Sequence, residues 1–291
     1  MTEWGPALAV ILGIVEGLTE FLPVSSTGHL ILVGHALGFT GDAAANAEIS
    51  IQLGAILAVI VFEREKISRL ISGAWQEQAV LRQLRNNGQH ATWQSVLLSS
   101  MRAHPSLWFV IGLGLAFLPA ATVGFLAHGW IKSVLFTPQT VAATSIIGGI
   151  IILLVEARAP RVTTTQLDQV SVKSAFWVGV AQCASLIPGM SRSGSTIIGG
   201  LLAGLDRKVA TEYSFFLALP TIIAATAYQM LKATATFTQQ DYIALGIGLI
   251  VSFLVAWAVI AAFLTYVQRH TLRVFAYYRI ILGILVFVVV R

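Results

Sequence analysis

Five ionisable or nucleophilic side chains lie in two short stretches of the chain. Glu16, Glu20, Ser26 and His29 fall within EGLTEFLPVSSTGH, and Arg192 falls within PGMSRSG. Ser26 and His29 are three residues apart, so on a helix they share a face, within reach for a hydroxyl nucleophile and an imidazole proton carrier. The planar fork of Arg192 suits bidentate binding of phosphate oxygens. Together these residue types indicate chemistry on a phosphate group.

The two glutamates need a compensating cation. Glu16 and Glu20 are four residues apart, which places both carboxylates on one face of a helix. We expect either a divalent ion with oxygen ligands, Mg²⁺ or Ca²⁺, or an arginine beside them. Two alternatives stay open: the carboxylates could cap backbone amides, and Arg192 could form an ion pair with Glu16 or Glu20.

Hydroxyl side chains surround both stretches. Ser25 and Thr27 follow Pro23 and begin an apolar segment, so we expect them at a helix N-terminus, where free amides attract anions. A plain capping role for Ser25 is an equal alternative. The hydroxyls of the second stretch add donors around Arg192, and they belong to Ser191, Ser193 and Ser195.

The elements that must position these residues belong to a membrane protein. Of the 291 residues, 56% are hydrophobic and 11% are charged, and the mean hydropathy is +0.81. Runs of about 20 apolar residues are long enough to cross a hydrocarbon core as helices. We predict an all-α integral membrane protein with six transmembrane helices, over 43–62, 107–127, 139–156, 211–231, 242–267 and 274–290.

Two apolar segments remain that are interrupted in the middle. Residues 4–39 are broken at FLPVSST and residues 174–205 at PGMSRSG, which leaves halves too short to cross alone. Broken backbone is tolerated at membrane depth only where it is buried in protein or faces water. We therefore predict two re-entrant helical hairpins, each with candidate site residues at its break.

The two hairpins align with each other. At one constant offset Gly13 matches Gly179 and Ser25 matches Ser191, and slightly downstream Glu48 matches Glu212. We predict an internal repeat, with residues 1–160 as the first unit and 161–291 as the second, each a hairpin followed by three spans. Chance matches among Gly and Ser are the alternative.

An odd number of spans between the hairpins implies an inverted-topology repeat, in which ligand sites form near the midplane from broken helices. Placing the loop 63–106 in the cytoplasm puts most loop Lys and Arg inside and leaves Lys132, Lys232 and Arg291 outside, as the positive-inside rule expects. For a bacterial inner membrane, both termini and the first hairpin then face the periplasm. The net charge of +5 suits contact with anionic membrane lipids and requires no nucleic acid.

Other ionisable residues at membrane depth are weaker candidates. We expect Glu48 and Glu212 to hold the scaffold, His35 to be packed or to line an exit, and Arg279 to pair with Glu212 or Glu156.

EGLTEFLPVSSTGH and PGMSRSG closely resemble the two signature motifs of the undecaprenyl-diphosphate phosphatase family of bacterial inner membranes, the bacitracin-resistance type. The resemblance covers essentially the whole chain. It implies removal of a phosphate from undecaprenyl diphosphate, which recycles the lipid carrier of peptidoglycan synthesis. It also implies a divalent cation, a periplasmic active site, and an active-site set at the matching positions Glu16, Glu20, Ser26, His29 and Arg192.

The hypothesis from these residues is in-line attack by Ser26 on a polyprenyl diphosphate. His29 or Glu20 would move the serine proton, and the sequence leaves these two roles open. A transporter or lipid flippase is the rival function, because inverted repeats with broken helices are typical of transporters. The oligomeric state is also open, with a homodimer among the alternatives.

Overall fold

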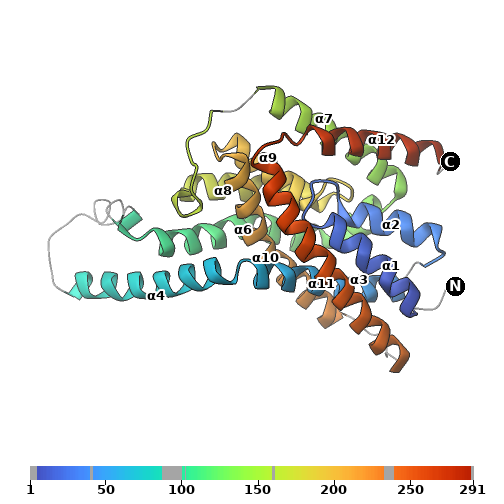
Figure 1. Ribbon diagram of the computed structural model, residues 1–291, viewed down its shortest axis with the longest axis horizontal. Helices are drawn as coiled ribbons and strands as arrows, with labels where there is room; N and C mark the ends of the chain where they lie inside the picture. The colour runs from blue at the N-terminus through green and yellow to red at the C-terminus, as the bar shows by residue number, and fades with distance from the viewer. Residues whose placement is uncertain are drawn as a thin grey trace.

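The computed structural model describes residues 5–39, 42–86, 100–101, 103–158, 161–232 and 239–289, and side chains are not described at 42–50, 79–86, 132, 229–230, 232, 239–241 and 289. Within these residues the fold is helical (Figure 1), and the one strand-like feature there is an isolated bridge between Thr164 and Leu205. The long helices are α3 (Asp42–Phe62), α4 (Arg64–Asn86), α6 (Pro105–Trp130), α7 (Pro138–Arg158), α10 (Arg207–Lys232), α11 (Gln239–Val267) and α12 (Arg273–Val289). The short ones are α1 (Pro6–Thr19), α2 (Ser26–Ala36), η1 (Ile131–Leu135), η2 (Leu167–Gln169), α8 (Val172–Gln182), η3 (Cys183–Leu186) and α9 (Arg192–Leu202).

Four helices of the described part are long and apolar enough to cross a membrane: α6, α7, the segment Arg207–Tyr228 of α10 and the segment Tyr242–Val267 of α11. They coincide with four of the six predicted spans. The other two predicted spans fall in α3, whose apolar part covers Ile51–Phe62, and in α12, which has 17 residues. The chain is therefore a multi-pass membrane protein.

The segments predicted to be interrupted are pairs of short helices. α1 has 14 residues, and α2, α8 and α9 have 11 each, fewer than the roughly 20 that a membrane crossing requires. α1 packs on α2, and α8 packs on α9. The chain between α1 and α2, Glu20–Ser25, is here called the first break, and Ile187–Ser191, between η3 and α9, is called the second break.

The two halves of the chain make equivalent helix contacts. α1 packs against α11, and α8, which corresponds to α1 in the predicted repeat, packs against α6. α3 packs against α10 and α7 against α12, so each of these helices contacts its own counterpart. The matched glycines explain part of this pattern. A Cβ on Gly13 would lie 2.9 Å from the carbonyl oxygen of Gly248 in α11, and a Cβ on Gly179 would lie 2.3 Å from that of Ala116 in α6.

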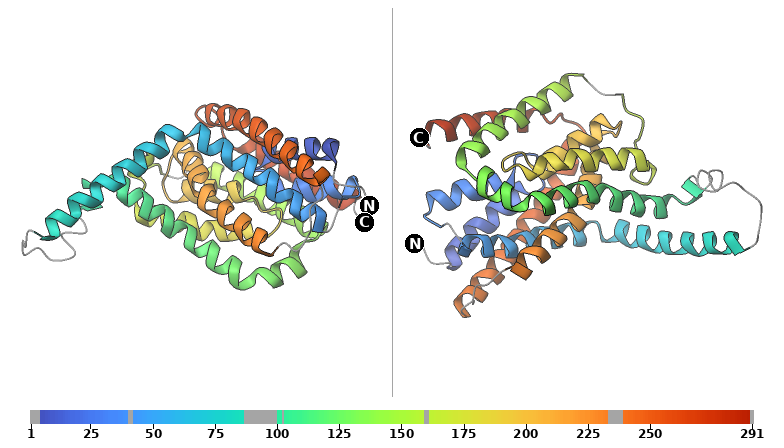
Figure 2. Two further views of the ribbon diagram at one scale, coloured as in Figure 1. Left: turned by 90° about the horizontal axis from the view of Figure 1, so that it is seen from below. Right: turned by 180° about the vertical axis from the view of Figure 1, so that it is seen from behind.

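The predicted cytoplasmic loop 63–106 is largely helical in its described part. α4 continues from α3 past Glu63 and packs against α6, and the two project together from the helical body (Figure 2). Glu77 of α4 accepts hydrogen bonds from the backbone N–H of Ser106 (3.4 Å) and Leu107 (2.6 Å), in the first turn of α6. A carboxylate at this position stabilises free amides and the positive end of the helix.

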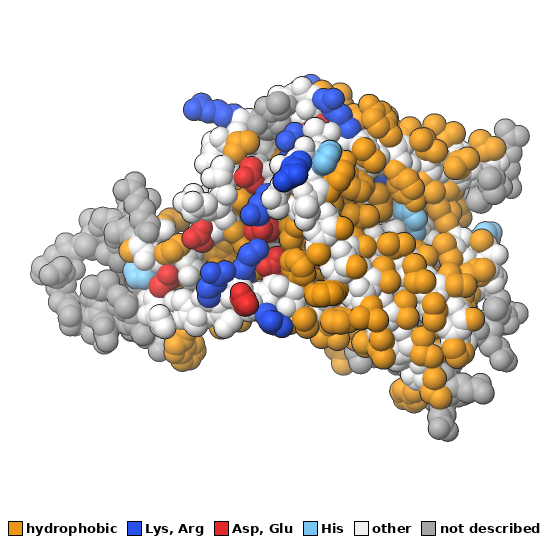
Figure 3. Space-filling view, in the orientation of Figure 1, with side chains coloured by type: hydrophobic (Ala, Val, Ile, Leu, Met, Phe, Trp, Pro, Cys, Tyr) orange, Lys and Arg blue, Asp and Glu red, His pale blue; other side chains and the backbone are white. Residues whose placement is uncertain are grey.

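Both ends of the fold lie on the side opposite this projection. α1 begins and α12 ends at one end of the molecule, while α4 extends from the other (Figures 1 and 2). Charged side chains gather where the α4 projection meets the body, and the described surface of the body to the right of them is largely hydrophobic (Figure 3). This division matches a membrane-embedded body with one water-exposed end.

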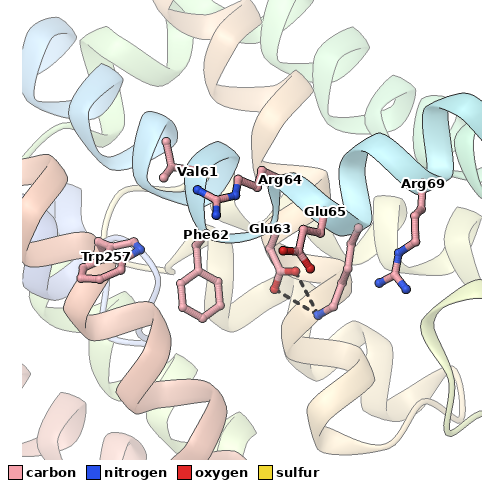
Figure 4. Close-up of a pocket in the computed structure, with 8 residues that line it drawn as sticks. Val61, Phe62, Glu63, Arg64, Glu65, Arg69 and Trp257 are labelled. Atoms are coloured by element: carbon pink, nitrogen blue, oxygen red, sulfur yellow. Dashed lines mark hydrogen bonds and ion pairs between the residues drawn. The ribbon is translucent and has the colours of Figure 1, made fainter.

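A pocket of about 410 Å³ lies at the junction of α3 and α4 (Figure 4). Its lining combines the apolar Val61, Phe62 and Trp257 with the charged Glu63, Arg64, Glu65, Lys66 and Arg69. Lys66 binds the carboxylate of Glu63 at 2.9 Å and that of Glu212 at 3.2 Å, which links α4 to α10. Glu212 therefore has the expected scaffold role, and it binds Lys66. The side chain of Glu48 lies outside those that the structure describes.

Candidate active site

Each break ends in a serine that caps the helix following it. Ser25 has φ of 75° and accepts a hydrogen bond from the N–H of Gly28 at 3.3 Å, while Ser191 has φ of 71° and accepts one from Gly194 at 3.0 Å. Positive φ is unfavourable for serine, and such strained residues cluster at functional sites. Of the two alternatives left open for Ser25, the structure shows the capping contact, and Ser191 makes the same contact.

Glu20, in the first break, connects the first residues of α2 and α9 through its carboxylate. The hydroxyl of Ser26 donates to Oε2 of Glu20, and Nη2 of Arg192 lies 2.9 Å from Oε1. The side chains of Glu20 and Arg192 are 7% and 11% exposed, so this is a buried ion pair. The anticipated pairing of Arg192 is thus with Glu20. Because Ser26 and Arg192 contact the two oxygens of one carboxylate, they lie within reach of a single diphosphate group.

The remaining contacts of Arg192 fix its orientation. Nη1 donates to the carbonyl oxygen of Ser214 at 2.9 Å and to its hydroxyl at 3.2 Å, and the guanidinium carbon lies 5.7 Å from the centroid of the Phe21 ring. Ser214 also contacts the hydroxyl of Thr196 at 2.7 Å. α10 therefore holds one edge of the guanidinium, and the other edge faces Glu20.

His29 is directed away from Ser26 by two other partners. Its Nδ1 lies 2.7 Å from the carbonyl oxygen of Ser25, and its Nε2 lies 2.6 Å from the hydroxyl of Tyr278 in α12. The two rings are parallel within 5°, with centroids 5.7 Å apart. In this arrangement Glu20, and not His29, is the group in contact with the Ser26 hydroxyl.

Arg279 binds backbone carbonyls from both breaks. Nη1 donates to the oxygen of Pro23 at 3.3 Å, and Nη2 donates to those of Gly189 at 2.9 Å and Thr144 at 3.2 Å. The side chain is buried. Ser193, in the first turn of α9, links that helix to the first break by donating to the carbonyl of Leu22 at 2.7 Å.

The expected pairing of Arg279 with Glu156 or Glu212 is wrong. Glu156 forms a two-pronged ion pair with Arg207, at 3.0 and 2.6 Å, and accepts from the N–H of Leu272. Glu212 binds Lys66. Free backbone carbonyls at the two breaks are alternative acceptors for a buried guanidinium, and nothing in the spacing of charged residues reveals them.

The other predicted site residues lie around this centre. Glu16 is fully buried one turn before Glu20 on α1. Thr27 and Ser195 lie in the first turns of α2 and α9 and are half-buried, whereas His35 is exposed at the end of α2. No cluster of three or more His, Cys, Asp or Glu side chains converges within the part of the chain that the structure describes.

Sequence reasoning missed two residues of this site. Ser214 lies next to Phe215 in an apolar helix, and Tyr278 precedes Arg279 on α12. The one available signal was Arg279, an arginine in an otherwise apolar segment, which marks α12 as a helix with a buried polar role.

Comparison with known proteins places the chain in a family. The family model of the bacitracin resistance protein BacA matches residues 9–285. The undecaprenyl-diphosphatase 3 of Acinetobacter baylyi is 46% identical over 278 residues, covering 96% of this chain and 95% of the relative. The undecaprenyl-diphosphatase of Thermoanaerobacter sp. is 46% identical over 283 residues, covering 97% and 96%, and that of Acinetobacter baumannii is 44% identical over 280 residues, covering 96% and 94%. The chain therefore belongs to the bacitracin resistance protein BacA family, as its two motifs predict.

Proposed function

We propose that the protein is a membrane phosphatase that hydrolyses undecaprenyl diphosphate to undecaprenyl phosphate and inorganic phosphate. The observation that carries this proposal is the joint contact of Ser26 and Arg192 with Glu20, which brings a nucleophile, a base and a cationic fork together. The names of the relatives point to the same reaction. The product would re-enter peptidoglycan synthesis, and its supply would counter bacitracin.

In the proposed reaction Ser26 attacks the terminal phosphorus in line. Glu20 takes the hydroxyl proton, because its Oε2 already accepts that hydrogen bond. The bond between the phosphorus and the bridging oxygen breaks, undecaprenyl phosphate leaves, and a phosphoserine remains. Water then hydrolyses the phosphoserine and restores the Ser26 hydroxyl.

Charge on the transferring phosphoryl group would be stabilised by Arg192 and by the backbone amides that begin α2 and α9. The guanidinium of Arg192 moves from Glu20 to the phosphate oxygens, which releases the carboxylate to act as base. The amides that open α2 and α9 face the same region and favour an anion there. Thr27 and Ser195, together with Ser191 and Ser193, are further hydroxyl donors near the head group.

We assign His29 to the leaving group and not to Ser26. Its Nδ1 is held by the Ser25 carbonyl, so proton exchange takes place at Nε2. A proton delivered from this side stabilises the departing phosphate oxygen.

A divalent cation is part of the proposal. The carboxylates of Glu16 and Glu20 are suitable ligands for a cation that binds together with the substrate. Mg²⁺ is commonly held by one or two carboxylates plus substrate phosphates, and Glu16 in the last turn of α1 and Glu20 directly after that helix supply two carboxylates one turn apart. When bound, such an ion would neutralise charge on the diphosphate.

The proposed membrane arrangement has six spans, with the pairs α1–α2 and α8–α9 as re-entrant hairpins of an inverted repeat. Matching helices in the two halves of the chain make matching contacts, which supports a pseudo-twofold axis that relates the two halves. The basic α4 end would lie in the cytoplasm of a bacterium, with the site open to the periplasmic side of the inner membrane. The prenyl tail would remain in lipid.

Purified protein tests the nucleophile. We expect Ser26→Ala to lower phosphate release from a polyprenyl diphosphate by about 10³-fold or more, because no oxygen remains to accept the phosphoryl group. Ser133→Ala, at an exposed serine of η1, serves as the control. Acid quenching of the wild type with labelled substrate should trap phosphate on Ser26.

The same assay distinguishes a phosphatase from a transporter. A transporter is the second candidate because the repeated helix contacts are also typical of transporter folds. In detergent there is no second compartment, so a transporter releases no phosphate. Turnover by the wild type supports the phosphatase. Absence of turnover with Mg²⁺ and Ca²⁺ present would favour the transporter, and full activity of Ser26→Ala would remove Ser26 from the mechanism.

A further inference from the structure

The contact between His29 and Tyr278 joins residues 249 positions apart in the sequence. The Tyr278 hydroxyl lies 2.6 Å from Nε2, and the parallel rings keep that oxygen near the imidazole plane. The hydrogen bond and the ring contact with Tyr278 are the contacts between α12 and the His29 side chain in the described part of the chain. They come from the last helix of the chain, far from both sequence motifs.

The hydrogen bonds determine the tautomer of His29. The carbonyl of Ser25 can only accept, so Nδ1 carries the hydrogen that it bonds at 2.7 Å. In the neutral ring Nε2 is then an acceptor, and the Tyr278 hydroxyl donates to it. In the protonated ring Nε2 donates, and the same hydroxyl accepts and turns its own hydrogen outward. A phenol hydroxyl therefore matches both protonation states of His29.

Arg279 fixes the position of Tyr278 on α12, while the Tyr278 side chain itself remains partly exposed. Arg279 is buried and bonded to carbonyls of both breaks, which sets the position of α12 relative to the site. Tyr278 itself is 44% exposed, whereas His29 is half-buried. The hydroxyl thus connects the imidazole with the space outside the packed helices.

We propose that Tyr278 both orients His29 and relays its proton to the leaving group, a role that rests on the proposed phosphatase function. As the leaving group departs, the Nε2–H bond of the imidazolium breaks and its proton moves to the Tyr278 oxygen. The original hydroxyl proton of Tyr278 passes to the leaving phosphate oxygen in the same step. The hydroxyl is regenerated, no tyrosinate forms, and the net change is one proton from His29 to the leaving group. The water that hydrolyses the phosphoserine supplies the proton that restores the imidazolium.

Tyr278→Phe tests the relay because it keeps the stacked ring and removes only the hydroxyl. We expect kcat to fall about 10-fold, part of the 10²–10⁴ that proton transfer commonly contributes, with KM within about twofold of the wild type. Tyr277→Phe, at the exposed neighbouring tyrosine, should leave both constants unchanged. In a His29→Ala background Tyr278→Phe should have no further effect, because the hydroxyl acts through the imidazole.

Histidine ¹⁵N resonances of the detergent-solubilised protein give a readout that needs no turnover. The wild type should show the Nδ1–H tautomer of His29, and Tyr278→Phe should shift the Nε2 resonance while Tyr277→Phe does not. A wild-type kcat for Tyr278→Phe, or an equal loss with and without His29, would overturn the relay. An unshifted Nε2 resonance would overturn the positioning role, even if the phosphatase reaction itself failed.

Discussion

Arg192 binds partners on both edges of its guanidinium, so its role depends on the shape of the side chain as well as on its charge. One edge of its guanidinium is bound by Ser214 and the other by Glu20, so the fork is oriented before any ligand enters. A lysine could keep the charge but not both sets of bonds. This distinction between charge and shape can be measured.

We predict that Arg192→Lys lowers kcat/KM by about 10²-fold, comparable to the loss of one oriented donor to a charged transition state. Steady-state phosphate release measures it. Arg207→Lys is the matched control, because Arg207 pairs with Glu156 outside the site. A loss for Arg192→Lys no larger than that for Arg207→Lys would contradict the bidentate role.

At the scale of the helices, α7 and α12 approach closely enough to place Arg279 between the two breaks. Gly148 of α7 makes this possible, because a Cβ there would lie 2.1 Å from Nη2 of Arg279. No side chain can occupy that position unless the guanidinium moves. The breaks would then lose their shared donor.

We predict that Gly148→Ala destabilises the protein by about 1–3 kcal/mol and reduces phosphate release about 10-fold or more. Thermal unfolding in detergent and the phosphatase assay measure the two effects. Gly246→Ala on α11 is the control, since a Cβ there meets nothing within 4 Å. Equal behaviour of the two variants would exclude the packing argument.

For the whole molecule, the ion pairs of Lys66 connect the α3–α4 junction with α10. Burial lowers the pKa of Lys66, but the hydrogen bonds and charges of Glu63 and Glu212 outweigh it and raise the pKa above its ordinary value of 10.5. A raised pKa means that this link stabilises the fold at neutral pH and is lost as the pH rises through the folded-state value.

We predict that Lys66→Met lowers stability by about 1 kcal/mol at pH 7, a modest value because the Lys66 side chain is 34% exposed. The difference from the wild type should shrink in unfolding experiments as the pH rises through the raised folded-state pKa of Lys66, and should disappear above it, where the lysine is neutral in both states. A difference that persists unchanged there would show that Lys66 acts through packing alone.

Much of this architecture could be predicted from composition and spacing. Four spans, the interrupted helices and the capping role of Ser25 follow from hydropathy and from where polar residues interrupt it. The pairing of Glu20 with Arg192 was one of two alternatives, because only the packing of the breaks selects the nearer carboxylate. Tyr278 and the carbonyl partners of Arg279 could not be predicted, since backbone acceptors and a single hydroxyl on an apolar helix leave no periodic signal.

The carboxylate of Glu20, bonded at once to Ser26 and Arg192, has a consequence for turnover. In the proposed reaction, an arriving diphosphate would displace the Glu20 carboxylate from Arg192 and would not enter a site with uncompensated positive charge. Its affinity would then be the difference between two electrostatic interactions, so we expect ground-state binding to be moderate. When inorganic phosphate departs, the Glu20 carboxylate would return to the guanidinium, and we expect product inhibition to be correspondingly weak.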